Sequence, residues 1–232
     1  MRIEERRYAE TARDYALRIL KNNIITMELE PGAMVSENEL AAQMGLSRTP
    51  VREALMDLAK ARVVDVLPQR GSRIALIDYS LVEEARFARE VLEVAVLDPV
   101  CERITAAEIA QLRQNVRLQT LTQEPGIGDS LSLMELDDAF HQMLFRIAQK
   151  ENTYNMLCGM TIHFDRVRNL ALNAVKDIKI IEDHQQVCEA VAVRDAAKAK
   201  EIMTRHLGRV RVDEEAVRSM YPQYIKASTK GF

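Results

Sequence analysis

Apolar residues recur with helical spacing along most of the chain, and the pattern changes character near residue 77. Before that point, short β-branched runs and turn signals follow three short helical patterns. After it, long amphipathic patterns continue almost to the end. We therefore place a domain boundary at 74–80, which gives a first domain of residues 1–77 and a second domain of residues 78–232.

The first part of the chain predicts a helix over residues 6–27, which ends at the Pro-Gly turn in ELEPGAMVS. Ser36 followed three residues later by Glu39 is a capping-box pattern, and it predicts the start of a second, short helix. Gly45 is suited to end that helix because glycine adopts positive φ without strain. A turn of three or four residues then leads to a third helix that Ser47 can cap.

The third helix has two distinct faces. One carries the apolar residues Val51, Ala54, Leu55 and Leu58, and the face beside it carries Arg48, Thr49 and Arg52. Two β-branched runs, VVDVL and SRIALI, follow and are joined by PQRG, which predicts a small hairpin with a four-residue connection. This order of elements is that of a winged helix-turn-helix.

The second part predicts an all-α bundle, so the fold class is mainly α. Only 5% of residues are aromatic and there is no Trp, which fits helices better than extensive sheet. The expected helices cover residues 79–103, 106–123, 130–149, 152–173, 177–193 and 195–220. Asp195 is a suitable N-cap for the last of them.

Composition removes several classes of protein. No apolar run approaches the roughly 20 residues that span a bilayer, and the N-terminus is charged, so we expect a cytoplasmic protein without a membrane partner. The three cysteines are far apart and indicate neither a disulfide framework nor a thiolate zinc site. The net charge is −3, yet residues 47–73 hold six basic side chains against three acidic ones. Any surface that binds a polyanion is therefore local.

The start of the third helix carries side chains that suit the major groove of DNA. Arg48 and Arg52 lie one turn apart and can donate to guanine O6 and N7, although such arginines also serve simply to solvate a small domain. Hydroxyl groups at the helix start bind phosphate oxygens, and a wing tip with Arg and Gly can approach the backbone closely. The expected DNA-binding residues are Ser47, Arg48, Thr49, Arg52, Arg70 and Gly71.

The segment from PGAMVSENEL to LPQRGSRI resembles the N-terminal domain of the GntR family of bacterial transcription regulators, and SRTPVREAL is a specific motif of that family. The resemblance covers about residues 10–76. It implies that the recognition-helix residues Arg48, Thr49 and Arg52 and the wing residue Gly71 contact operator DNA. One departure is Asn38, where some members place an Arg.

Polar residues interrupt three apolar stripes of the second part. Asp137 and His141 lie one turn apart in one stripe, and His184 and His206 lie in two others. A buried carboxylate is costly unless it is paired or binds a cation, and one Asp oxygen with three imidazoles suits Zn²⁺, Ni²⁺ or Mn²⁺. A single interior His is commonly just a satisfied core residue, and His163 also falls on a stripe, so spacing alone leaves its role open.

Residues 79–216 resemble the FadR-type C-terminal ligand-binding domain known as FCD. LDDAFHQML matches its Asp-x-x-x-His motif, and DHQQVCEAVAVRDAAKAKEIMTRHL matches its closing segment with two His. The resemblance implies metal coordination by Asp137, His141, His184 and His206. Arg89 matches a family Arg that can face the pocket, where it would bind a carboxylate; a salt bridge to a neighbouring acid is the alternative.

The sequence thus predicts a homodimeric DNA-binding regulator, a repressor rather than an enzyme. Its operator affinity would respond to a small carboxylate effector, of the sugar-acid or hydroxy-acid class, bound at a metal in the helical domain. Two alternatives compete: a metal-free effector-responsive regulator, and a metal-dependent hydrolase or lyase with an attached DNA-binding module. Glu135 and Asp138 are the nearest general bases for such an enzyme, and their helical angle turns them away from the stripe.

Overall fold

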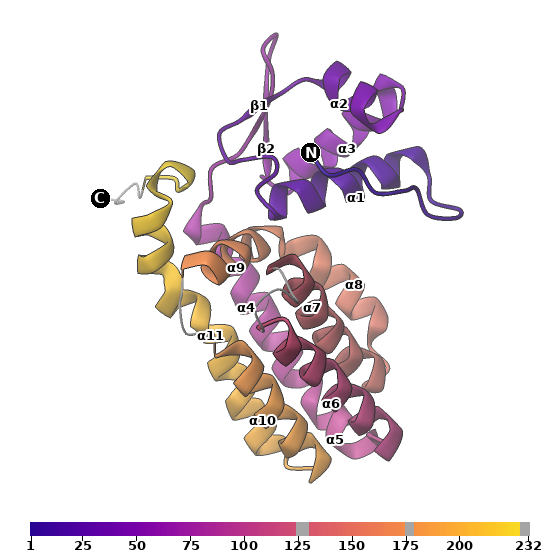
Figure 1. The fold of residues 1–232 in the computed structure, drawn as a ribbon, viewed down its shortest axis with the longest axis vertical. Coiled ribbons are helices and arrows are strands. Elements are labelled where there is room, and N and C mark those ends of the chain that lie inside the picture. The colour runs from indigo at the N-terminus through magenta and orange to yellow at the C-terminus, as the bar shows by residue number, and fades with distance from the viewer. Residues whose placement is uncertain (124–129, 175–178, 228–232) are drawn as a thin grey trace. The chain divides into compact units, whose positions relative to one another are not determined.

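The computed structural model describes residues 1–123, 130–174 and 179–227 (Figure 1). The chain forms two compact units: the first contains Met1–Val82 together with the chain from Tyr221 onward, and the second contains Glu83–Met220. The structural division lies a few residues beyond the expected boundary at 74–80. The described residues from Tyr221 onward pack with the first unit, although the sequence pattern assigns them to the second.

The first unit is a helix-turn-helix with a small antiparallel sheet of strand order β1-β3-β2. Its elements are α1 (Ala12–Ile25), β1 (Met34–Val35), α2 (Glu37–Met44), α3 (Arg48–Lys60), β2 (Val64–Leu67), β3 (Gly71–Ile74) and a short 3₁₀ helix, η1 (Pro222–Tyr224). The winged helix-turn-helix is confirmed. Strand β1, which pairs Met34 with Arg73 of β3, adds a strand that the sequence did not predict.

Local hydrogen bonds explain where the first helices begin and end. The expected start of α1 near residue 6 is wrong, because the hydroxyl of Thr11 accepts a hydrogen bond from the backbone N–H of Asp14 and caps the helix there. Ser36 does precede α2, but its side chain makes no capping hydrogen bond, so the predicted capping box is not formed. Gly45 ends α2 with a φ of 64°, as expected.

The core of the first unit lies between α1 and α3. The predicted apolar face of α3 is fully buried and packs on α1, which contributes Ile19, Leu20 and Ile24. The wing turns through Pro68, Gln69 and Arg70, and Leu67 pairs directly with Gly71. The connection is therefore three residues long rather than four. Two positive φ angles, 61° at Gln69 and 92° at Gly71, make this tight turn possible.

The C-terminal segment, residues 221–227, is attached to the stretch of chain that follows the wing. Ile225 forms a parallel bridge with Ile77, and the ammonium of Lys226 lies 2.8 Å from a carboxylate oxygen of Asp78. Lys226 hydrogen-bonding lowers the pKa of Asp78 to about 2 against the opposing effect of burial. The last described residues are thus held by both backbone and charge.

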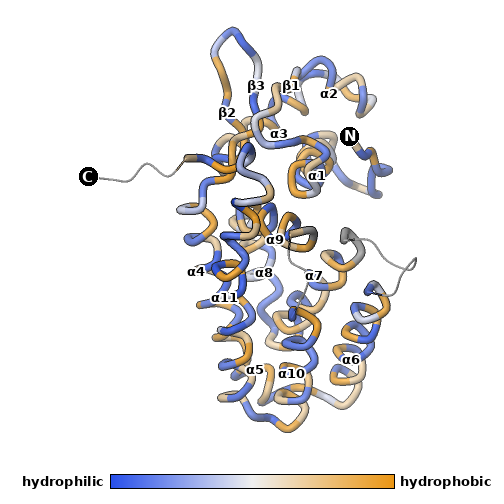
Figure 2. The backbone as a smooth tube through the Cα atoms, turned by 60° about the vertical axis from the view of Figure 1, so that its left-hand side comes forward, coloured by the Kyte–Doolittle hydropathy of each residue, from blue (hydrophilic) through white to orange (hydrophobic). Residues whose placement is uncertain are grey.

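The second unit is a bundle of helices that lie side by side (Figure 1). They are α4 (Tyr79–Ala95, whose first turn belongs to the first unit), α5 (Leu97–Arg103), α6 (Ala106–Leu121), α7 (Ser130–Ile147), α8 (Glu151–Met160), α9 (Ile162–Ala174), α10 (Ile180–Ala192) and α11 (Ala196–Met220). Figure 2 shows hydrophobic and hydrophilic stretches alternating along α6 and α10, as expected of amphipathic helices. Within the described residues, no helix combines the length and apolarity needed to cross a membrane.

Two helices that the sequence predicted as continuous are broken. The helix expected over 79–103 divides at Val96, because Pro99 has no N–H to donate to the carbonyl of Ala95 and its ring crowds that carbonyl. The helix expected over 152–173 divides at Thr161, whose hydroxyl donates to the carboxylate of Asp165 at the start of α9. Such local hydroxyl bonds compete with continuation of a helix.

Replacing Gly71 with Ala should destabilise the first unit. A Cβ at this position would lie 3.3 Å from the backbone oxygen of Val35, on a residue with a φ of 92°. Left-handed backbone costs a non-glycine residue about 1–2 kcal/mol, so amide hydrogen exchange in β3 should become faster. Gly159→Ala is the control, because a Cβ there would meet no atom within 4 Å and helical Ala is favoured. Unchanged exchange in β3 of Gly71→Ala would contradict this account.

Candidate metal centre and nucleic-acid interface

Three helices bring one carboxylate and three imidazoles together inside the bundle. Asp137 and His141 come from α7, His184 comes from α10, and His206 comes from α11. One ligand atom from each lies within 4.8 Å of all the others, and all four residues are buried. His163 is also buried, on α9, but it does not belong to this group.

The atoms that face one another in this group are short of hydrogen-bond partners. Asp137 Oδ1, His141 Nε2 and His184 Nε2 are buried without a hydrogen bond. His184 Nε2 lies 3.6 Å from Asp137 Oδ1, and His141 Nε2 lies 3.7 Å from Asp137 Oδ2. Buried polar atoms are rarely left unpaired. A carboxylate oxygen and imidazole nitrogens that converge in this way fit a divalent transition metal.

The opposite nitrogen of each imidazole faces a side-chain oxygen. The Nδ1 contacts are His141 to Glu93 Oε2 at 2.6 Å, His184 to Gln119 Oε1 at 2.9 Å, and His206 to Asp183 Oδ2 at 3.8 Å. Of the three contacts, only that of His184 is a hydrogen bond, whereas His141 Nδ1 and His206 Nδ1 have no hydrogen-bond partner by geometry among the described residues. A side-chain oxygen beside Nδ1 favours the tautomer with a proton on Nδ1 and a lone pair on Nε2. The geometry thus prepares the inward nitrogens to act as ligands.

Burial and charge set the protonation states in the cluster. Burial opposes ionisation of Asp137, but nearby positive charge, above all that of Arg168, outweighs it and holds the pKa of Asp137 far below its usual value. Burial lowers the pKa of His184 well below its usual value, and it also lowers the pKa of His206. An ionised carboxylate and neutral imidazoles are the forms that bind metals.

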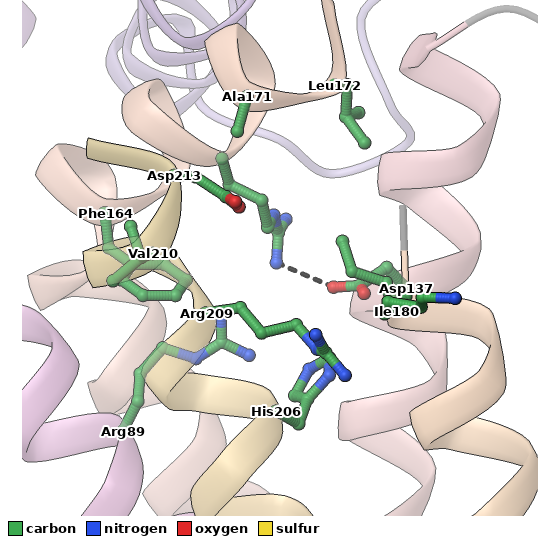
Figure 3. A pocket seen from close by; sticks show the side chains of 12 residues that line it. Arg89, Asp137, Phe164, Ala171, Leu172, Ile180, His206, Arg209, Val210 and Asp213 are labelled. Carbon is green, nitrogen blue, oxygen red and sulfur yellow. Dashed lines mark hydrogen bonds and ion pairs between the residues drawn. The ribbon is translucent and has the colours of Figure 1, made fainter. Parts of the chain in front are cut away.

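A pocket in the bundle opens beside the cluster (Figure 3). Its volume is about 60 Å³, several times what one water molecule needs. Its charged lining consists of Arg89, Arg168, Lys179, Arg209, Asp137 and Asp213, together with His206. Four cations therefore face two carboxylates, which favours an anionic ligand.

Arg89 both lines the pocket and forms a salt bridge, the two alternatives considered for it from the sequence. It lines the pocket, with its guanidinium 4.7 Å from the ring centroid of Phe164. Its Nε also donates to Glu93 Oε1 at 2.5 Å, one turn further along α4. The salt bridge and the place at the pocket are thus compatible.

Sequence reasoning missed the residues that support the four ligands. Arg168 on α9 donates to Asp137 Oδ2 at 2.7 Å, and it is buried. Glu93 carries a usable signal, because it is an acid one turn from Arg89 on an apolar stripe. Asp183 precedes His184 directly, and only the structure reveals that it faces His206. No spacing rule connects Gln119 to His184, which lies on another helix.

The expected DNA-binding residues lie at the start of α3 and at the tip of the wing. Ser47 is the N-cap of α3, and its hydroxyl makes no capping bond. Thr49 and Arg52 are exposed, as are Arg70 and Gly71 in the wing. The Arg48 side chain is 64% exposed and donates to Glu37 of α2 at 2.5 Å.

A groove beside the start of α3 is lined by one further cation, Arg13, that sequence reasoning missed. Arg48, Thr49 and Arg52 line the groove together with Arg13 from the start of α1. Arg13 forms an ion pair with Asp57 of α3, which also accepts from Lys60 at 2.9 Å. Basic side chains from two helices therefore border the exposed face of α3.

Comparison with known proteins identifies both parts of the chain. The sequence profile of bacterial regulatory proteins of the gntR family matches residues 14–74, and that of the FCD domain matches residues 84–209. The chain belongs to the GntR family. It is a DNA-binding transcriptional regulator with a helical ligand-binding domain.

Relatives of the regulator match over most of their length. An HTH-type transcriptional regulator in an unstable DNA locus of Streptomyces ambofaciens is 38% identical over 88% of this chain and 85% of its own. The HTH-type transcriptional repressor RspR of Escherichia coli K12 is 32% identical over 88% and 87%. The solved structure of E. coli McbR/YncC has the same fold, with a TM-score of 0.74 and 18% identity over 91% of this chain and 99% of its own.

Membership of this family excludes the enzyme alternative, because these proteins regulate transcription. The structure agrees about the two acids considered as general bases. Glu135 is exposed, and the Asp138 side chain is 55% exposed and accepts from Arg168 at 2.5 Å. Both side chains turn away from the buried cluster, as their helical angle predicts.

Replacing Arg168 with Leu should destabilise the helical unit of the metal-free protein. The change removes the cation next to Asp137 Oδ2 and leaves a buried carboxylate uncompensated, which costs about 3–5 kcal/mol in comparable sites. Urea unfolding measures this loss. Asp138→Asn is the control, because it removes only a half-exposed partner of the same Arg. Equal stability of the two variants would show that Asp137 does not depend on Arg168.

Proposed function

We propose that the regulator is a homodimeric repressor whose operator affinity depends on a small carboxylate bound beside a metal ion in the helical unit. One observation carries this proposal: inward-facing ligand atoms without hydrogen-bond partners adjoin a pocket with an excess of cations. RspR, with which the chain shares 32% identity, is named a repressor. Effector binding would change how the two winged units of a dimer engage a pseudo-palindromic operator.

The DNA side of the proposal is supported by exposure and chemistry at the start of α3. Arg48 and Arg52 would read base edges in the major groove, and Ser47 and Thr49 would hold phosphate oxygens. Arg70 would contact phosphate or the minor groove, and Gly71 would let the wing backbone approach DNA closely.

The ligand side is supported by the cluster and its surroundings. Asp137, His141, His184 and His206 would hold Zn²⁺, Ni²⁺ or Mn²⁺. A metal with open coordination positions binds carboxylate and hydroxyl oxygens, which favours hydroxy acids and sugar acids as effectors. Arg89 would add a guanidinium that binds the effector's carboxylate from the other side of the pocket.

Dimerisation is supported by a pair of exposed apolar side chains on α4. Phe87 and Val91 lie one turn apart and are 64% and 50% exposed. Large apolar side chains in such a row are typical of an interface. We assign part of the dimer contact to residues 79–104.

Arg52→Ala should weaken specific operator binding by about 1–3 kcal/mol, because it removes a side chain that can donate twice to one guanine. A gel shift against the operator at fixed salt measures this change. Arg117→Ala is matched in charge and lies on an exposed position of α6 in the helical unit, so it should leave affinity unchanged. Full operator affinity in Arg52→Ala would rule out the assigned contact.

His184→Ala should lower the metal content of the protein, because it removes one of four converging ligands. Elemental analysis of protein purified without a His-tag or chelator measures metal per chain. His163→Ala is the control, since this buried His lies outside the cluster. Equal metal content in wild type and His184→Ala would contradict the ligand set.

The same measurement separates the proposal from the metal-free alternative. Wild-type protein that takes up none of Zn²⁺, Ni²⁺ and Mn²⁺ would support a regulator whose histidines bind the effector directly. About one metal per chain would support the four-ligand site. The assignment of the winged unit to DNA binding is independent of this result.

A further inference from the structure

Two buried carboxylates are each shared between the pocket and the cluster. Glu93 Oε1 accepts from Arg89 at 2.5 Å, and Glu93 Oε2 lies 2.6 Å from His141 Nδ1. The side chain of Glu93 is only 1% exposed, so water does not replace either partner. What happens at one oxygen of this carboxylate therefore affects the other.

Asp183 makes a similar but looser connection, because its distance to the imidazole is too long for a hydrogen bond. Its oxygens accept from Arg209, whose Nη2 lies 2.9 Å from Oδ1, and its Oδ2 lies 3.8 Å from His206 Nδ1. Arg205 also donates to Oδ1, at 2.9 Å, but it does not line the pocket. Asp183 is 1% exposed. Both Arg89 and Arg209 line the pocket, as Figure 3 shows.

The third imidazole provides an internal contrast. His184 Nδ1 faces the neutral amide oxygen of Gln119 at 2.9 Å. The amide nitrogen of Gln119 donates to Asn115 Oδ1 at 2.7 Å and lies 3.4 Å from the carbonyl of Leu136. None of these partners lines the pocket. Two of the three histidines are thus connected to the pocket through a charge, and the third is not.

We propose that Glu93 and Asp183 are positioning residues that couple anion binding in the pocket to the metal-binding strength of His141 and His206. The inference rests on the proposed metal site. An anion that binds Arg89 or Arg209 competes with the carboxylate for the guanidinium. More of the carboxylate's negative charge is then available to the imidazole Nδ1–H. A stronger acceptor at Nδ1 makes Nε2 a better ligand. Anion and metal therefore strengthen each other's binding, because such coupling is reciprocal.

The first test measures Zn²⁺ affinity of the full chain by competition with a chromophoric chelator. Glu93→Gln should weaken Zn²⁺ binding by about 10- to 100-fold, the usual effect of losing such a partner. Asp183→Asn should weaken it less, because Asp183 Oδ2 lies 3.8 Å from His206 Nδ1. Glu84→Gln is the matched control, because it is the same substitution at an exposed position of α4. Its Zn²⁺ affinity should equal that of wild type.

A double-mutant cycle tests the connection to the pocket with the metal alone. Arg89→Gln should change Zn²⁺ affinity when Glu93 is present and have no effect in the Glu93→Gln background. Arg209→Gln and Asp183→Asn should behave in the same way. Arg89→Gln and Gln119→Leu should instead have independent effects. The double variant Arg89→Gln, Glu93→Gln removes both charges together. It can therefore still be measured if the Arg89→Gln single variant does not fold.

The chemical shift of the imidazole N–H proton is a readout that a change in fold stability alone would not alter. Nitrogen-15 spectra of the metal-free protein should show His141 protonated on Nδ1, and Glu93→Gln should shift that proton upfield while His184 is unchanged. A proton on Nε2 of His141 in wild type would overturn the inference.

The affinity measurements distinguish the inference from the function on which it rests. Wild type that binds Zn²⁺, with Glu93→Gln and Asp183→Asn binding it equally well, would overturn the positioning role and leave the metal site standing. Additive effects of Arg89→Gln and Glu93→Gln would overturn the coupling. Wild type that binds no Zn²⁺, Ni²⁺ or Mn²⁺ would overturn the proposed metal site and the inference with it.

Discussion

The negative charge of Asp137 is the constraint on which the helical unit depends. A carboxylate buried among helices is stable as an ion only if positive groups and hydrogen bonds replace the water it has lost. Arg168 from α9 supplies one such group, and it holds Oδ2 at 2.7 Å. Oδ1 remains without a hydrogen bond and faces the imidazole of His184. A metal ion is the group that would satisfy this oxygen and the inward nitrogens together.

The same charge balance determines what the pocket can accept. Arg89 and Arg209 are each paired with an acid that also faces a histidine, so their charges are only partly neutralised. Lys179 adds a further cation, and burial raises the pKa of the opposing acid Asp213. A neutral or cationic ligand would gain little from such a lining. A preference for anionic ligands would therefore follow from how the bundle stabilises its buried acids.

Features set by the local sequence pattern could be predicted, whereas contacts between residues far apart in the sequence could not. The apolar face of α3 followed from its helical spacing. The grouping of Asp137, His141, His184 and His206 was also predictable, because polar residues on an apolar stripe must be accommodated in the core. The break at Val96 was missed, although Pro99 is a local signal for it. The bond from Gln119 to His184 was not, because it joins residues 65 positions apart on different helices. The missing bond at Ser36 reflects side-chain geometry rather than sequence.

Intramolecular acids also shape the surface that we propose binds DNA. Arg48 is paired with Glu37, and Arg13 and Lys60 share Asp57, whereas Arg52 and Arg70 have no ion pair within the described part of the chain. Exposed pairs contribute at most about 1 kcal/mol, so phosphates can displace Glu37 at little cost. The acids nevertheless reduce the positive electrostatic potential around this surface, which weakens the long-range attraction of DNA of any sequence. Base contacts, rather than net charge, must then provide most of the preference for an operator.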